Sequence, residues 1–447
     1  MSCLLCINNK IVIELSYRFG FRVIKKKMTC GIGSFYFFMS EQIKQTELGF
    51  EKLGINTLIL QVLKILNLTS PTAIQVKSIP IILAGQDLIG VAQTGTGKTF
   101  AFGIPMIEQL VLGKGQGLIL VPTRELALQV DESLRKIGSK LGLRTSVLIG
   151  GEAIGRQAQS VRRNPHILIA TPGRLIDHLK RNWLKLNNIK ILVLDEADLM
   201  FDMGFVPQIE EIIKQIPKER QTLLFSATMP ISILKLASSH MNLPIHIEVA
   251  PQGTTVEQVN QEIYIIKKED KYIQLKKIFD QYNSGLILVF VRTKYSVKEL
   301  AKDLKLSNYK VAEIHSNLSF NQRCEAIAGF KNKKYRILIA TDIAARGIDI
   351  REIELVVNYD LPDSSEDYVH RIGRTARAGD VGKAISFATP NQRKNILSIE
   401  RLINKKINLK KFVELDQERA RPRYLKRGRS LNFIYKRKTN KRILLKK

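Results

Sequence analysis

The stretch "GLILV" occupies residues 117–121 and occurs a second time at residues 285–289. Another stretch, "ILIAT", occupies residues 167–171 and occurs again at residues 337–341. The two pairs are separated by nearly the same length of chain. Because two matches at nearly one spacing are typical of an internal repeat, the sequence predicts a domain that is present twice.

Both stretches are short apolar runs that stop at a polar residue or a proline. Similar runs occur at residues 191–194, 222–225 and 355–357, and stretches with helical spacing, such as residues 125–140 and 294–304, lie between the runs. Alternation of this kind is typical of buried parallel strands whose carboxyl ends lead into functional loops. The expected fold class is therefore α/β, with a parallel sheet in each copy.

The expected organisation has five parts. The first copy covers residues 39–249 and the second covers residues 259–396. The stretch between them, residues 250–258, is polar and contains proline and glycine, so it is interpreted as a linker. Residues 1–38 form an N-terminal extension, and residues 397–447 form a basic C-terminal tail.

Charge is concentrated at the C-terminus. The chain has 447 residues and a formal net charge of +30. Residues 401–447 hold 18 Lys and Arg against 3 Asp and Glu. Such a block is typical of nucleic-acid binding, and a solvated tail without a partner is the alternative. No apolar run reaches the roughly 18 residues that a membrane helix needs. Four cysteines are too few for a disulfide framework.

A glycine-rich turn, "AQTGTGKT", occupies residues 92–99. Gly95, Gly97, Lys98 and Thr99 match the second half of a phosphate-binding loop, in which backbone N–H groups surround the phosphates. Lys98 is expected to reach the β- and γ-phosphates, and Thr99 to bind Mg²⁺. Ala92 replaces the first glycine of the strict pattern, so an ordinary strand-to-helix turn is the alternative.

Three carboxylates follow an apolar run in "ILVLDEADLMFDMGF", residues 191–205. One interpretation of Asp195, Glu196 and Asp198 is an acidic turn that caps a helix. The phosphate-binding loop favours another, because such enzymes deliver an acid to the magnesium from a second strand. Asp195 is then the ligand of Mg²⁺ through water, and Glu196 polarises the attacking water.

Ten short motifs follow one another along most of the chain. They are Phe50 with "PTAIQ" (71–75), "AQTGTGKT" (92–99), "PTRELA" (122–127), the pair Gly150 and Gly151, "TPGR" (171–174), "DEAD" (195–198), "SAT" (226–228), "LVFVRTK" (288–294), "ATDIAARGID" (340–349) and "HRIGRTARAG" (370–379). In this order they resemble the motifs of the DEAD-box RNA helicases, most of all the bacterial members with short tails. The resemblance implies two tandem RecA-like domains with an ATP cleft between them.

The resemblance implies a role for each matching position. The implied catalytic residues are Lys98, Asp195, Glu196, Arg374 and Arg377. The implied ATP-binding residues are Phe50, Gln75, Gln93, Thr94, Gly95, Thr96, Gly97, Lys98, Thr99 and Asp349. Coupling between nucleotide and RNA is implied for Asp198, Ser226, Thr228 and His370. RNA binding is implied for Thr123, Arg124, Gly151, Thr171, Gly173, Arg174, Arg323 and Thr341.

The implied activity is ATP-dependent separation of short RNA duplexes by closure of the two domains. ATP and Mg²⁺ are the expected cofactors, and RNA, bound through its backbone, is the expected partner. Two alternatives are an ATP-gated RNA clamp without productive unwinding and a DNA helicase of the same superfamily. Residues 1–38 match nothing in the family, so translation is expected to start at Met39. The alternative is that these residues are an organelle presequence. The expected localisation is cytoplasmic, or an organelle matrix if the presequence is real.

One segment departs from the family pattern. In "EIHSNLSFNQR", residues 313–323, Ser316 replaces a common glycine, Asn317 an aspartate and Phe320 a glutamine. Because serine avoids positive φ, the loss of glycine is expected to restrict the turn and to affect RNA contacts there.

Overall fold

The computed structural model describes residues 5–7, 10–12, 49–93, 95–113, 115–249, 259–345, 350, 352–375 and 382–411. The chain divides into two compact units, of which the first comprises residues 1–92 and 97–249 and the second comprises residues 93–96 and 250–447. The expected roles of Thr94, Asp349 and Arg377, the linker and most of the basic tail lie outside the described residues.

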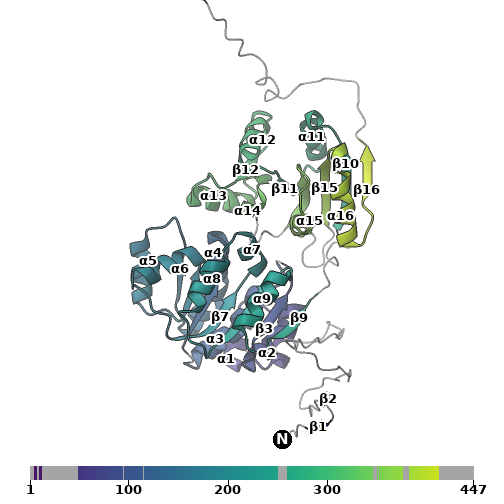
Figure 1. Ribbon diagram of the computed structural model, residues 1–447. Helices are drawn as coiled ribbons and strands as arrows, with labels where there is room; N and C mark the ends of the chain where they lie inside the picture. The colour runs from purple at the N-terminus through teal and green to yellow at the C-terminus, as the bar shows by residue number, and fades with distance from the viewer. Residues whose placement is uncertain are drawn as a thin grey trace, which may run out of the picture. The chain divides into compact units, whose positions relative to one another are not determined.

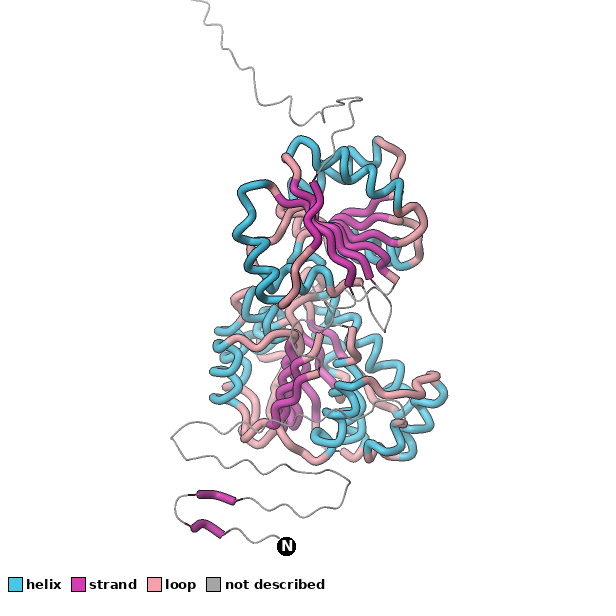
Figure 2. Tube along the Cα trace, turned by 90° about the vertical axis from the view of Figure 1, so that its right-hand side faces the viewer, coloured by secondary structure: helices cyan, strands magenta, loops and turns pink. Residues whose placement is uncertain are grey.

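The first unit is built on a seven-stranded sheet in which every described pair of neighbouring strands is parallel (Figures 1 and 2). Its order is β5-β6-β4-β7-β8-β3-β9. The strands are β3 (Leu88–Val91), β4 (Gln116–Leu120), β5 (Thr145–Leu148), β6 (Ile167–Ala170), β7 (Ile189–Leu194), β8 (Gln221–Ser226) and β9 (Ile245–Glu248). Every residue of β4 and β6 is buried, as expected where helices cover both faces of a parallel sheet.

The helices of the first unit begin at sequence signals. Thr123 caps α4, its side chain accepting a hydrogen bond from Leu126 N, and Thr72 and Gln75 form a capping box at α2. The helices are η1 (Phe50–Leu53), α1 (Thr57–Ile65), α2 (Ala73–Leu83), α3 (Lys98–Val111), α4 (Arg124–Gly138), η2 (Ser139–Leu141), α5 (Ile154–Arg162), α6 (Pro172–Lys180), α7 (Ala197–Asp202), α8 (Val206–Ile213) and α9 (Ile231–His240).

The second unit has a seven-stranded parallel sheet of the order β12-β13-β11-β14-β15-β10-β16. Its strands are β10 (Val259–Ile265), β11 (Leu286–Phe290), β12 (Val311–Ile314), β13 (Ile337–Ala340), β14 (Ile353–Asn358), β15 (Gly382–Ala388) and β16 (Asn408–Lys411). Its helices are η3 (Lys268–Asp270), α11 (Lys271–Gln281), α12 (Lys294–Leu306), α13 (Phe320–Lys331), α14 (Asp342–Ala345), α15 (Ser365–Ile372), η4 (Pro390–Gln392) and α16 (Arg393–Ile403).

The two sheets have one topology. Numbered along the chain within each unit, the strands follow the order 3-4-2-5-6-1-7 in both sheets. The repeated stretches fall on equivalent strands, with "GLILV" at β4 and β11 and "ILIAT" at β6 and β13. The predicted duplication and the α/β fold class are therefore confirmed.

The second sheet extends further along the chain than the sequence indicated. The expected boundary at residue 396 falls inside α16, which buries Ile396, Ile399 and Ile403. After this helix β16 pairs in parallel with β10 and forms the edge of the sheet. Lysines at the start of the basic block obscured this strand, because an edge strand needs few apolar residues.

Two short strands near the N-terminus form a separate two-stranded sheet. The short strands β1 (Leu5–Ile7) and β2 (Lys10–Val12) pair with each other in antiparallel fashion. Among the described residues, none of the helices has both the length and the apolar character needed to cross a bilayer.

Candidate functional site

The glycine-rich turn joins β3 to α3, which are both elements of the first unit. Gly95 and Gly97 have φ values of 85° and 96°, which residues with a side chain rarely adopt. A Cβ atom at Gly97 would lie 2.5 Å from Gln75 Nε2. Thr96 Oγ1 donates a 2.7 Å hydrogen bond to Gln93 O within the turn. The turn leads directly into α3 at Lys98, so the positive end of a 14-residue helix faces the loop.

Lys98 and Glu196 form a buried ion pair at the carboxyl edge of the sheet. Lys98 Nζ lies 2.8 Å from Glu196 Oε1, and the two side chains are 5% and 7% exposed. Burial alone would lower the pKa of Lys98, but Glu196, Asp195 and Asp198 together raise it. The lysine is therefore charged and held by carboxylates in a site shielded from water.

Asp195 lies beside this pair at the end of β7. Burial raises the pKa of Asp195 to about 7, with Lys98 opposing the shift and Glu196 adding to it. The positive charge of Lys98 thus offsets only part of the free energy that burial and mutual repulsion of two adjacent carboxylates cost. The carboxylate of Asp195 would be stabilised by a further cation, and oxygen ligands such as this carboxylate and the Thr99 hydroxyl suit Mg²⁺.

Glu196 and the residues after it occupy an unusual turn. Glu196 has φ 53° and ψ 51°, in the left-handed region, where glutamate is uncommon. Asp198 then accepts three hydrogen bonds with its Oδ2 atom, from Ala227 N, Thr228 N and Thr228 Oγ1. Ser226 Oγ in turn accepts a 3.2 Å hydrogen bond from Asp198 N. The structure thus brings together the three residues of the first unit that were assigned to coupling, Asp198, Ser226 and Thr228.

The side chain of Gln75 contacts the glycine-rich turn. Its Nε2 atom donates to Gly97 O at 3.1 Å, and its Oε1 atom accepts from Thr72 N at 2.9 Å. Each atom keeps the capacity for one more hydrogen bond, which an adenine edge can use. Phe50, expected to stack on the adenine, is 4% exposed and offers little free surface.

A second group of predicted residues gathers where β4, β5 and β6 end. Arg124, in the first turn of α4, lies against the turn that holds Gly150 and Gly151. A Cβ atom at Gly151, where φ is 82°, would lie 2.0 Å from Arg124 Nη1. Thr171 is the N-cap residue of α6, and at Gly173 the position of a Cβ atom is open. Hydroxyls, arginines and accessible backbone at one edge suit contacts to a nucleic-acid backbone.

Gln157 of α5 connects these loops, and the sequence did not single it out. Its Nε2 atom donates to Ile149 O at 2.8 Å, and its Oε1 atom accepts from Arg174 Nη1 at 3.3 Å. The same oxygen lies 3.3 Å from His178 Nε2. Gln157 is 4% exposed, so one buried amide holds both the Gly150–Gly151 turn and Arg174. No residue pattern distinguishes this glutamine from its neighbours on α5.

In the second unit the predicted residues again follow the strand ends. Thr341 follows β13, Arg323 is in the first turn of α13, and His370 and Arg374 lie at the end of α15 and just after it. Arg371, beside His370, donates to both oxygens of Asp342, and its guanidinium lies 5.1 Å from the centre of the Phe290 ring. The sequence did not single out this pair.

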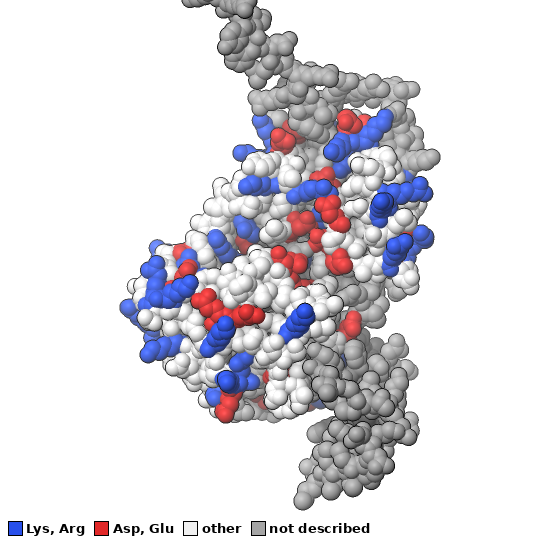
Figure 3. Space-filling model, viewed as in Figure 1, with Lys and Arg blue, Asp and Glu red and all other residues white. Residues whose placement is uncertain are grey.

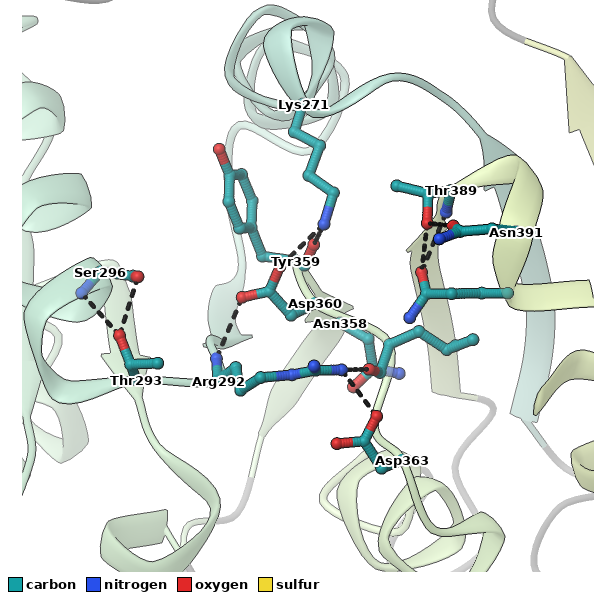
Figure 4. A network of polar contacts seen from close by, with 12 residues as sticks. Lys271, Arg292, Thr293, Ser296, Asn358, Tyr359, Asp360, Asp363, Thr389 and Asn391 are labelled. Atoms are coloured by element: carbon teal, nitrogen blue, oxygen red, sulfur yellow. Dashed lines mark hydrogen bonds and ion pairs between the residues drawn. The ribbon is translucent and has the colours of Figure 1, made fainter. Parts of the chain in front are cut away.

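A polar network fixes the same edge of the second sheet (Figure 4). Lys271 Nζ donates to Asp360 Oδ1 at 2.8 Å and to Tyr359 O at 2.7 Å. Arg292 N donates to Asp360 Oδ2, and Arg292 Nη2 donates to Asp363 Oδ1. Burial would raise the pKa of Asp360, but Lys271 and Arg292 lower it below its usual value. The network joins the loops after β11 and β14 to α11.

The segment that departs from the family pattern forms a regular helix start. Ser319 caps α13 in a capping box with Gln322. His315 Nδ1 accepts a hydrogen bond from Asn317 N. Ser316 does not adopt a positive φ, which agrees with the expectation that serine avoids this region, and the effect on RNA contacts stays a prediction. Phe320 is the first residue of α13.

The fold and the site together define a class. Two sheets of RecA-like order, with a phosphate-binding loop, a buried lysine and two acids at the end of a nearby strand, are typical of P-loop nucleoside triphosphatases.

The comparisons with known proteins narrow this class to a family. Residues 72–236 match the family described as DEAD/DEAH box helicase, and residues 270–379 match the helicase conserved C-terminal domain. The DEAD-box ATP-dependent RNA helicase CshA of Geobacillus kaustophilus is 42% identical over 370 residues, covering 82% of this chain and 79% of the relative. CshA of Bacillus subtilis is 41% identical and covers 82% of this chain and 75% of the relative. The chain belongs to the family of DEAD-box ATP-dependent RNA helicases.

Solved structures of the same fold agree with this assignment. S. cerevisiae Dbp5 bound to RNA and ADP BeF3 has a TM-score of 0.73 and 30% identity, with 81% of this chain and 95% of that chain covered. Mss116p bound to ssRNA and AMP-PNP has a TM-score of 0.77 and 28% identity, with 84% and 82% covered. The RecA-like fold of each unit is thereby confirmed.

Proposed function

We propose that the protein is an RNA-stimulated ATPase that uses ATP to separate short RNA duplexes locally. The observation that carries this proposal is the buried pair of Lys98 and Glu196 beside Asp195, at the end of the phosphate-binding loop. The relatives named above are RNA helicases, and the two solved structures hold RNA with nucleotide analogues, which supports RNA and ATP as the ligands.

The ion pair joins the two side chains, Lys98 and Glu196, to which the proposed reaction gives different roles. Lys98 Nζ donates a 2.8 Å hydrogen bond to Glu196 Oε1, so this carboxylate balances the positive charge of the lysine. When ATP binds, the phosphates compete for Lys98, because a polyphosphate carries more negative charge than one carboxylate. Glu196 is then released, and its carboxylate can orient the attacking water and accept its proton.

Asp195 and Thr99 would hold Mg²⁺, which neutralises the charge that develops on the phosphates. Gln93, Thr94, Gly95, Thr96 and Gly97 would surround the phosphates, Gln75 and Phe50 would contact the adenine, and Asp349 would contact the ribose. Arg374 and Arg377 would stabilise the γ-phosphate during transfer.

RNA would bind in both domains through Thr123, Arg124, Gly151, Thr171, Gly173, Arg174, Arg323 and Thr341. Asp198, Ser226, Thr228 and His370 would couple the two ligands. ATP and RNA both favour domain closure in this proposal, so each raises the affinity for the other.

The domain limits expected from the sequence belong to the same proposal. The first domain of the helicase core covers residues 39–249, and residues 250–258 form the linker. The second domain, expected over residues 259–396, extends to residue 411 in this proposal, because α16 and β16 belong to its sheet unit. Residues 1–38 precede this core. We place the activity in the cytoplasm, and an organelle matrix is the alternative if residues 1–38 are a presequence.

ATP hydrolysis with and without single-stranded RNA tests the proposal. RNA is expected to stimulate hydrolysis by the full-length protein. Glu196→Gln is expected to lower the stimulated rate about 100-fold or more while ATP still binds, because the amide cannot accept the proton. Glu210→Gln, at an exposed position of α8, is the matched control and should keep the wild-type rate.

Two outcomes would contradict the proposal. Equal rates with and without RNA in the wild-type protein would remove the RNA-stimulated cycle. RNA held tightly with ATP but not released by hydrolysis would point instead to the ATP-gated clamp.

A further inference from the structure

Helices α5 and α6 carry an excess of exposed positive charge. Residues 151–190 hold eight Lys and Arg against two Asp and Glu. Five of the cations are exposed on or just after the two helices, and we call this set the α5–α6 basic face: Arg156, Arg162, Arg163, Lys180 and Arg181. In Figure 3 blue side chains gather over this end of the first unit.

These five cations are not neutralised by neighbours. Within the described part of the chain, no ion pair involves any of their side chains. Helix α4 of the same unit is different, because Arg135 pairs with Asp131 and Lys136 with Glu132, one helical turn apart. The two acids of the α5–α6 region are occupied elsewhere, as Glu152 lies 3.3 Å from Gln157 Nε2 and Asp177 lies 3.7 Å from Arg174 Nε.

The basic face is continuous with the residues proposed to bind RNA. Helix α5 begins just after Gly151, and α6 begins at Pro172, beside Gly173 and Arg174. The two helices lie side by side, since Gln157 of α5 contacts Arg174 and His178 of α6 (Figure 1). Each has nine residues, so each extends about 13 Å from the RNA-binding edge. That length spans about four phosphates of one helical strand.

An aromatic side chain lies at the far end of the face. Trp183 follows α6 and is partly exposed. The guanidinium of Arg181 lies 5.1 Å from the centre of its ring, and the ring of His178 meets it edge-on at 5.9 Å. A cation stacked on an indole beside unpaired cations is a combination that strand-binding proteins use for phosphates and bases.

We propose that the α5–α6 basic face is an accessory RNA site that binds the strand where it leaves the loops of the first domain. This inference rests on the proposed RNA-dependent function and extends its binding surface along two helices. The phosphates would lie against the unpaired arginines and lysines, so binding there would be independent of sequence and sensitive to salt.

The test compares RNA lengths on the full-length protein in the presence of a non-hydrolysable ATP analogue. One RNA has about 6 nucleotides, and two others are extended to about 14 nucleotides at the 5′ or the 3′ end, within the size range of strand-binding sites. The variant combines Arg156→Gln, Arg163→Gln and Arg181→Gln. The control combines Lys64→Gln, Lys218→Gln and Lys235→Gln, which removes the same charge from exposed positions on other elements of the first unit.

Extension at one end is expected to tighten binding to the wild-type protein. The arginine variant should lose about tenfold or more of that affinity, and its slope of log affinity against log salt should fall by about 2, because three phosphate contacts are lost. Its affinity for the 6-nucleotide RNA and its RNA-stimulated ATPase at saturation should not change. Equal losses in the two variants, or no gain from extension at either end, would overturn the proposal.

The outcome also separates this inference from the function on which it rests. If the short RNA binds and stimulates hydrolysis but extension adds nothing, only the accessory site is wrong. If the wild-type protein neither binds the short RNA nor responds to it in hydrolysis, the proposed function fails as well.

Discussion

Two residues at the end of β7 have conformations or environments that lower the stability of the fold. Glu196 adopts a left-handed backbone conformation. Burial raises the pKa of the neighbouring Asp195 to about 7. Both features cost stability and are typical of positions kept for function. The sequence predicted that Asp195 and Glu196 share a site with the phosphate-binding loop. It could not show the strained turn or the ion pair of Glu196 with Lys98, because both depend on tertiary packing.

Gln157 supports a prediction at this scale. Gln157→Met keeps the volume but removes the hydrogen bonds to Ile149 O and Arg174. We expect the RNA concentration for half-maximal ATPase stimulation to rise about tenfold, with the saturated rate retained, because a lost hydrogen bond to a charged group costs about 1.5–3 kcal/mol.

The control is Gln116→Met. Gln116 is also buried and donates a 2.8 Å hydrogen bond to a carbonyl, that of Pro165, at the opposite end of the sheet. Both variants should lose similar thermal stability. If Gln157→Met needs the same RNA concentration for half-maximal stimulation as the wild-type protein, Gln157 has no part in positioning Arg174. The same conclusion holds if this concentration rises equally in the control.

Among elements, the loops after β11 and β14 depend on Asp360. Lys271 and Arg292 lower its pKa, so the charged form stabilises the second unit. A depressed pKa gives stability that is present above the usual value near 4 and is lost as pH falls through the folded-state value. We therefore expect the free energy of unfolding of the second unit to decrease below about pH 4.

Asp360→Asn should remove this pH dependence and lower the stability near neutral pH by about 2 kcal/mol, because the bonds to charged partners are lost. Denaturation of the full-length protein, followed by hydrogen exchange in β11 and β14, would measure it. Asp363→Asn is the control, since its partner Arg292 is half exposed and the pair is worth little. An identical acid response in Asp360→Asn and the wild-type protein would contradict the assignment.

For the whole molecule, the repeated apolar runs were sufficient to predict two parallel sheets, because buried strands of one topology need similar residues. The same reasoning missed β16, whose lysines at an edge position do not resemble a buried strand. It also missed the pairing of Arg371 with Asp342, since contacts across 29 residues leave no local pattern. Motif order predicted the positions of the site residues, and tertiary packing determined how they contact one another.

The basic tail gives a prediction for the full chain. Deleting residues 416–447 is expected to weaken RNA binding and to reduce its salt dependence, because most of the cations of the C-terminal block are removed. Affinities measured between about 50 and 200 mM salt would show the change. A salt slope equal to that of the full chain would assign the tail another role.

Trp183 also determines how the protein can be observed by fluorescence. It is the single tryptophan of the chain, and it lies on the first unit between Arg181 and His178. Selective excitation of indole therefore gives an optical signal from one place only, with no attached label. Its emission would follow the protonation of one imidazole and the approach of a nucleic-acid strand, while the twelve tyrosines stay silent. The chain thus contains its own spectroscopic reporter, placed where the strand is proposed to leave the core.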